Sequence, residues 1–124
     1  MVNRKFRWVP PILWGLLITV LSLIPGGPGT LHLFGIPHID KIGHFGMYAV
    51  WAFLVFHAFS AGADLSQKKS MWFSFILLTL IGITLEFGQD LLTDYRSYEV
   101  ADMMANGLGS LAGSLVGWFF RPRP

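Results

Sequence analysis

The stretch DKIGHFGMYAVWAFLVF, from Asp40 to Phe56, decides the fold of this chain. It begins with a charge pair, reaches a histidine at the fifth position, and continues as an apolar run. Asp40, His44 and Tyr48 lie at intervals of four positions, so a helix would carry all three on one stripe. What such a stripe does depends on the solvent around the helix, which the rest of the chain indicates.

The composition is that of a membrane protein. Hydrophobic residues make up 53% of the 124 residues and charged residues only 13%, whereas a typical soluble domain is about 25% charged. The chain has no cysteine, which excludes disulfides and thiolate metal sites. Its formal net charge of +2 is too small to indicate binding to nucleic acid.

Four long apolar segments organise the chain. We predict helices at about 8–24, 42–62, 71–89 and 102–120, in one domain that covers residues 1–124. A membrane-crossing helix needs about 17–25 largely apolar residues, and the third segment reaches this length only if Glu86 lies inside the helix. Polar residues gather at the segment ends and form no continuous polar face. The expected fold class is therefore all-α, a four-helix transmembrane bundle.

The basic residues predict the orientation of this bundle. Lys41 and Arg96 lie on one side of the predicted membrane. The other Lys and Arg residues lie before the first helix, between the second and third, and after the fourth: Arg4, Lys5, Arg7, Lys68, Lys69, Arg121 and Arg123. The positive-inside rule then places both termini in the cytoplasm. We expect a multi-pass protein of the cell membrane.

In this orientation, polar residues from three helices and a loop share the outer leaflet. An ionisable side chain in the membrane costs about 2.5–3.5 kcal/mol at mid-depth, so we expect these groups to face the bundle interior. They form a predicted ligand-binding site on the extracytoplasmic side: Asp40, Lys41, His44, Tyr48, Glu86, Gln89, Arg96, Asp102 and Asn106.

Structural roles for the same residues stay open at this stage. Asp40 and Asp102 suit the caps of helix N-termini, where a carboxylate meets unpaired backbone N–H groups. Glu86 and Arg96 suit a structural ion pair, and Lys41 suits a contact with lipid headgroups.

The fourth helix carries a separate pattern of small residues. Ala105, Gly109, Gly113 and Gly117 recur every four residues. Such a ridge lets two helix backbones approach closely in a membrane. The partner is either a helix of the same chain or a second copy, which would make a homo-oligomer through the fourth helix.

In this order and spacing, the polar residues resemble the VanZ-like family, named for a teicoplanin-resistance protein. The resemblance rests on three blocks and reaches from the second helix to the last: Asp40-Lys41-x-x-His44-x-x-x-Tyr48, then Glu86-x-x-Gln89 and Arg96, then Asp102-x-x-x-Asn106-x-x-Gly109-x-x-x-Gly113. It implies a bacterial envelope protein, with some relatives linked to resistance to glycopeptide antibiotics. It does not imply a particular reaction.

Three functions are compatible with these patterns. The first is binding of an anionic lipid or lipid-linked cell-envelope precursor, with Lys41, His44 and Arg96 as cationic donors. The second is a membrane-embedded hydrolase or transferase that acts on a lipid headgroup, with His44 and Glu86 as candidate catalytic acid and base. The third is a purely structural assembly partner. We assign no cofactor and no metal, although the acidic residues and His44 are of a ligand type that divalent cations accept.

Overall fold

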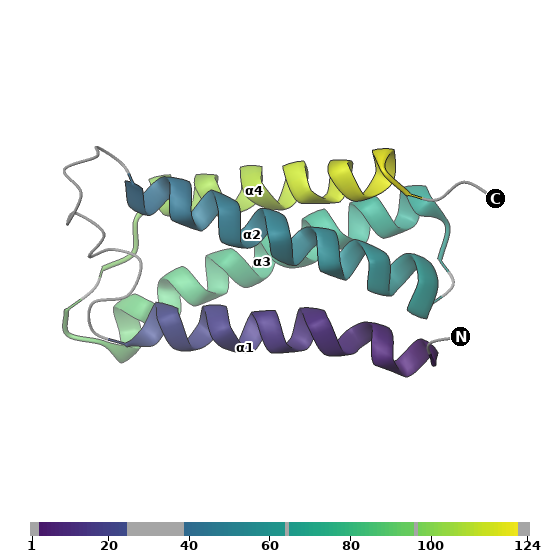
Figure 1. The fold of residues 1–124 in the computed structure, drawn as a ribbon. Helices are drawn as coiled ribbons and strands as arrows, with labels where there is room; N and C mark the ends of the chain where they lie inside the picture. The colour runs from purple at the N-terminus through teal and green to yellow at the C-terminus, as the bar shows by residue number, and fades with distance from the viewer. Residues whose placement is uncertain (1–2, 25–38, 64, 96, 122–124) are drawn as a thin grey trace.

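A computed structural model of the chain describes residues 3–24, 39–63, 65–95 and 97–121. Four long helices lie side by side in a bundle (Figure 1): α1 Val9–Leu23, α2 Ile39–His57, α3 Gln67–Leu92 and α4 Val100–Phe119. A 3₁₀ segment, η1 Arg4–Trp8, precedes α1, and a π-helical turn, η3 Ala58–Gly62, continues α2. The described residues contain no strand, so the all-α prediction is confirmed.

The helix bounds differ from the predicted ones mainly in α3, which extends beyond residues 71–89 at both ends. It starts early because the Ser66 hydroxyl accepts the backbone N–H of Lys69 at 3.3 Å and caps the helix. α2 and α4 also begin before residues 42 and 102. As a result Asp40 and Asp102 lie inside the first turns, and Glu99 occupies the cap position of α4 without a side-chain cap bond.

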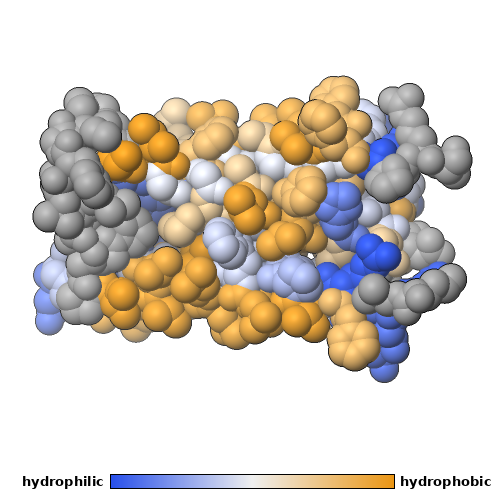
Figure 2. All heavy atoms as spheres, viewed as in Figure 1, coloured by the Kyte–Doolittle hydropathy of each residue, from blue (hydrophilic) through white to orange (hydrophobic). Residues whose placement is uncertain are grey.

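Three helical segments are long and apolar enough to cross a membrane: Arg4–Leu23, Ile39–Ala61 and Gln67–Leu92. α4 is not among them, which differs from the predicted four spans. Its polar and small residues explain this, because Asp102, Asn106, Ser110 and Ser114 replace apolar side chains along its buried face. The bundle surface is nevertheless largely apolar along its middle, with hydrophilic residues towards both ends in this view (Figure 2).

Successive helices run in opposite directions, so α2 and α4 are parallel to each other (Figure 1). Two ends of the bundle follow from this arrangement. The basic end, where η1 starts and α4 finishes, carries Arg4, Lys5, Arg7, Lys68, Lys69 and Arg121. The acidic end, where α2 and α4 start and α3 finishes, carries Asp40, Glu86, Asp90, Glu99 and Asp102.

The most extensive helix contact joins α2 to α4 through the small-residue ridge. A methyl group added at Gly109 or at Gly113 would lie closer than 3.0 Å to a backbone carbonyl oxygen of α2, that of Phe45 or Ala49 respectively. At Gly117 the added methyl would meet the ring of Phe56. The glycine face of α4 therefore packs against α2 of the same chain, backbone to backbone.

Helix α1 makes fewer contacts with the bundle and is fastened by hydrogen bonds. The Trp14 indole Nε1 donates to the carbonyl of Met47 in α2 at 3.0 Å. Near the acidic end, Gln89 Nε2 donates to the carbonyl of Ser22 at 2.8 Å, and the Tyr95 hydroxyl donates to the carbonyl of Leu23. Carbonyls in the last turn of a helix lack intrahelical partners, so these two bonds complete the end of α1.

Candidate functional site

Polar residues from α2, α3 and α4 meet at the acidic end of the bundle. We call them the polar cluster: Asp40, Lys41, His44, Glu86, Glu99, Asp102 and Asn106. α2 and α4 are parallel and start at the same end of the bundle. Polar residues four positions apart in the first turns of each helix therefore lie at the same level. The cluster contains most of the predicted site residues and adds Glu99.

His44 of α2 lies between two side chains of α4 that are one turn apart. Its Nδ1 is 3.0 Å from Asn106 Oδ1, and its Nε2 is 3.7 Å from Asp102 Oδ2. All three residues are buried, with His44 only 4% exposed. Both ring nitrogens thus face oxygens of α4, so His44 joins α2 to two successive turns of α4.

Lys41 is surrounded by carboxylates. Its Nζ lies 2.7 Å from Asp40 Oδ2, 2.7 Å from Glu99 Oε2 and 3.1 Å from Asp102 Oδ1. An ammonium group has three donors. Two of them form hydrogen bonds to Asp40 and Glu99, and Asp102 is held as an ion contact. The predicted role of Lys41 as a donor to an anionic ligand therefore requires that the ligand replace one of these carboxylates.

Glu86 connects α3 to the start of α4. It is 2% exposed, and its Oε1 accepts the backbone N–H of Glu99 at 3.0 Å. A carboxylate at this position also faces the positive end of the α4 dipole. The predicted partner Arg96 lies outside the described residues. The proposed acid–base pairing of Glu86 with His44 stays a prediction, because the hydrogen bond and the ion contact described for His44 both lead to α4.

Tyr48 lies one turn below His44 and is buried, with 2% of its surface exposed. Its ring packs beside Trp51, with centroids 5.6 Å apart. Gly82 of α3 lies against both Tyr48 and Asn106, and a methyl at Gly82 would be 3.2 Å from the tyrosine ring. Tyr48, a member of the apolar core, thus lies beside Asn106 where the polar cluster borders that core.

Gln89 belongs to a different part of the fold. Its side chain is 3% exposed and donates to Ser22 of α1. The described bond thus links α3 to α1 and not to the polar cluster, although the sequence places Gln89 one turn from Glu86.

Replacing Gln89 with leucine is expected to loosen α1. The Ser22 carbonyl would lose its donor inside the bundle, which costs about 1–3 kcal/mol of unfolding free energy. Thermal unfolding in detergent checks this, together with the rate at which a protease cleaves between α1 and α2. Asp90→Asn, at an exposed neighbouring position, serves as the control. Equal stability of Gln89→Leu and the control would show that the Ser22 bond does not hold α1.

Three carboxylates of the cluster are close enough to share a cation. Oxygens of Asp40, Glu99 and Asp102 lie within 4.8 Å of one another. Lys41 Nζ contacts all three, so the lysine already supplies a positive charge at this place. The set of possible metal ligands considered from the sequence shares only Asp40 and Asp102 with this group.

Glu99 was not recognised from the sequence. It stands immediately before the first residue of α4, and helix starts favour acidic residues. This signal marks a helix terminus without pointing to Lys41, which lies fifty-eight positions away. Only the packing of α2 on α4 brings the two residues together.

Comparison of the chain with protein-family models, curated proteins and solved structures found no match.

Proposed function

We propose that this chain is a VanZ-like integral membrane protein whose polar cluster binds the headgroup of an anionic lipid or a lipid-linked cell-envelope precursor. The observation that carries the proposal is the convergence of Lys41, His44, Asp102 and Asn106 at one end of a largely apolar bundle. A stabilising core does not require this concentration of buried charge, since apolar residues of similar size pack as well or better.

In this proposal all four helices cross the membrane. α4 has 20 residues, which at 1.5 Å per residue span about 30 Å, the thickness of the hydrocarbon core. Its polar face is turned towards α2 and α3, so lipid meets its apolar face. Both termini lie in the cytoplasm by the positive-inside rule, and the polar cluster lies on the extracytoplasmic side. A contribution to glycopeptide resistance belongs to the same proposal.

The charges of the cluster define how an anionic headgroup would enter. Glu99 is the most exposed partner of Lys41, with 53% of its side chain accessible, against 16% for Asp40 and 11% for Asp102. A phosphate group would therefore take the place of Glu99 on the lysine ammonium. The N-termini of α2 and α4 lie at the same end and add the positive ends of two helix dipoles.

Removing the Glu99 charge is therefore expected to strengthen binding. Glu99→Gln leaves Lys41 with fewer competing charges, and a half-exposed ion pair of this kind is worth up to about 1 kcal/mol. A polyprenyl monophosphate should then bind about three- to five-fold more tightly. Lys41→Gln should bind it about ten-fold more weakly, because a charged hydrogen bond is lost. Binding to the purified protein in nanodiscs is measured by native mass spectrometry.

The sign of the Glu99→Gln effect decides the class of ligand. Weaker binding in this variant, with an aminated headgroup preferred to a phosphate, would show that the cluster recognises a cation and would overturn the anionic assignment. Asp90→Asn removes an exposed carboxylate at the same end and controls for a general change in surface charge.

A further inference from the structure

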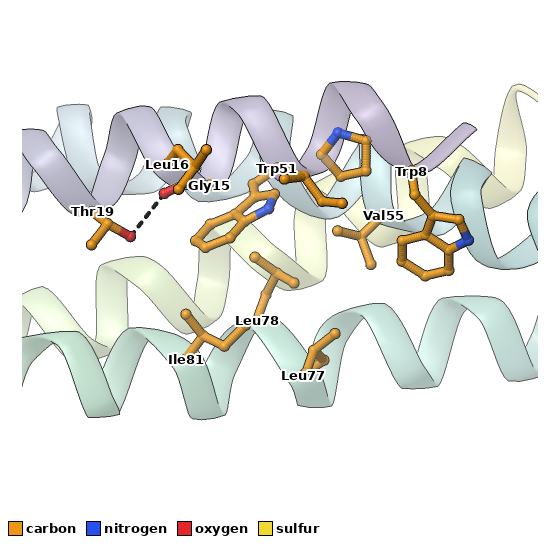
Figure 3. Close-up of a pocket in the computed structure, with 11 residues that line it drawn as sticks. Trp8, Gly15, Leu16, Thr19, Trp51, Val55, Leu77, Leu78 and Ile81 are labelled. Carbon is orange, nitrogen blue, oxygen red and sulfur yellow. Dashed lines mark hydrogen bonds between the residues drawn. The ribbon is translucent and has the colours of Figure 1, made fainter. Parts of the chain in front are cut away.

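An apolar groove opens between α1 and α3, away from the polar cluster (Figure 3). It has a volume of about 270 Å³, and its lining includes Trp8, Gly15 and Leu16 from the first helical segment, Trp51 from α2, and Leu77 and Ile81 from α3. The ring of Trp51 fills the space opposite Gly15, where an added methyl would lie closer than 3.0 Å to it. The floor of the groove is thus formed by the ring of Trp51, a core residue that is 8% exposed.

The mostly apolar lining favours an apolar occupant of the groove. The hydroxyl of Thr19 is turned back to the carbonyl of Gly15 at 2.8 Å, so it is not directed at an occupant. The groove, at about 270 Å³, is also smaller than one turn of another helix, which with side chains occupies more than about 400 Å³. A single hydrocarbon chain fits its shape and its apolar surface, and the groove lies along α1 and α3, both of which are apolar enough to cross a membrane.

The end of the groove near Trp8 is strongly basic. η1 contains Arg4, Lys5 and Arg7 and no acidic residue. Arg7 also borders a second hollow of about 250 Å³ on the other side of α1, and Pro11 lines both hollows. Basic residues at a membrane surface attract anionic lipids with about 1 kcal/mol each, which corresponds to about a five-fold preference.

We infer that this groove binds one anionic glycerophospholipid of the leaflet that faces the basic end, with an acyl chain against Trp51 and the phosphate at η1. The basic residues of η1, which adjoin the groove at Trp8, and the apolar lining of the groove carry this inference together. The lipid site is independent of the polar cluster, which lies at the opposite end of the bundle, so either proposal can fail without the other.

Quenching of tryptophan fluorescence by brominated acyl chains tests the inference, because bromine acts only at short range. The full-length chain retains Trp51, while Trp8, Trp14, Trp72 and Trp118 are changed to phenylalanine. It is placed in phosphatidylcholine nanodiscs that contain a small fraction of brominated phosphatidylglycerol. A matched set of nanodiscs carries the same bromine content on phosphatidylcholine. We expect Trp51 to be quenched at a several-fold lower fraction of the anionic lipid.

Two matched pairs of variants separate the chain contact from the charge contact. Leu77→Phe fills the groove and should reduce quenching by both lipids, whereas Leu80→Phe, at a 58% exposed position outside the groove, should not. Arg7→Gln should reduce the preference for the anionic lipid about five-fold. Lys68→Gln, which lies at the basic end about two and a half helical turns from Leu77 and so on the opposite face of α3, should leave the preference unchanged.

Equal quenching by both lipids would overturn the inference, as would an equal effect of Arg7→Gln and Lys68→Gln, because either result indicates unselective surrounding lipid. If the variant with four tryptophans replaced does not fold, native mass spectrometry of the unaltered chain gives a second measurement. The wild type should retain phosphatidylglycerol at a collision energy that strips phosphatidylcholine, and Arg7→Gln should not. Loss of both lipids together in the wild type would count against the site.

Discussion

Gly113→Ala is expected to lower the unfolding free energy of the bundle more than any other single methyl addition along α4. The new methyl would lie closer than 3.0 Å to the carbonyl oxygen, carbonyl carbon and Cα of Ala49, so the backbones of α2 and α4 must move apart. Backbone atoms cannot change rotamer to make room as a side chain does. We expect a loss of about 3 kcal/mol or more, at or above the upper end of the usual cost of overpacking.

Glycine-to-alanine substitutions elsewhere in the chain should stabilise the fold instead. At Gly46 and Gly88, which lie within α2 and α3, an added methyl meets nothing within 4 Å. Alanine has a higher helix propensity than glycine, so these variants should gain about 0.5–1 kcal/mol. Thermal unfolding of the three variants in one detergent makes the comparison. A Gly113→Ala protein as stable as Gly46→Ala would mean that α2 and α4 do not approach as closely as described.

Lys41→Met is expected to have the second largest effect. It would leave the carboxylates of Asp40, Asp102 and Glu99 facing one another without the charge that joins them. Removing one partner of a buried ion pair costs about 3–5 kcal/mol, and the partial exposure of this lysine lowers the expected loss to about 2–4 kcal/mol. The loss is measured as a decrease in unfolding free energy, at low and at high salt.

A compensating variant tests whether charge is the cause. Lys41→Met combined with Asp102→Asn removes one unit of each sign, so it should recover at least half of the stability lost in the single variant. Lys68→Met removes a lysine from the exposed start of α3 and should change stability by less than about 0.5 kcal/mol. If the double variant is no more stable than Lys41→Met, loss of packing by the lysine stem explains the effect instead.

The local features of the fold were predictable because they depend on short spacings. Residues four apart on α2 and on α4 mark two stripes, and the stripes predicted that His44 and Asn106 face the bundle interior. The ridge containing Gly113 likewise predicted a close backbone contact. The sequence could not decide between a helix of the same chain and a second copy, because the partner surface, the carbonyl of Ala49, has no side-chain signature.

The pairing of particular side chains was less predictable, because it depends on the axial offset between helices. Lys41 meets Glu99, and Gln89 meets the Ser22 carbonyl, only because of how far each helix is shifted along its neighbour. The hydropathy of α4 shows a similar limit of prediction from sequence. Its hydropathy is too low for a span by composition, since its buried face is polar and small. The polar face is covered by α2 and α3, and sequence hydropathy does not register such cover.

The parallel pairing of α2 with α4 has a consequence for biosynthesis. In the membrane topology that we propose, the ribosome completes α2 before α4, since all of α3 is made between them. The stripe of His44 and Tyr48 would then leave the insertion machinery without its final cover. The tightest contact of the bundle can form only once the last helix has emerged. A nascent chain that stops before Val100 would therefore expose that stripe to lipid, and membrane proteases or chaperones that recognise polar groups in the bilayer would meet it at that stage.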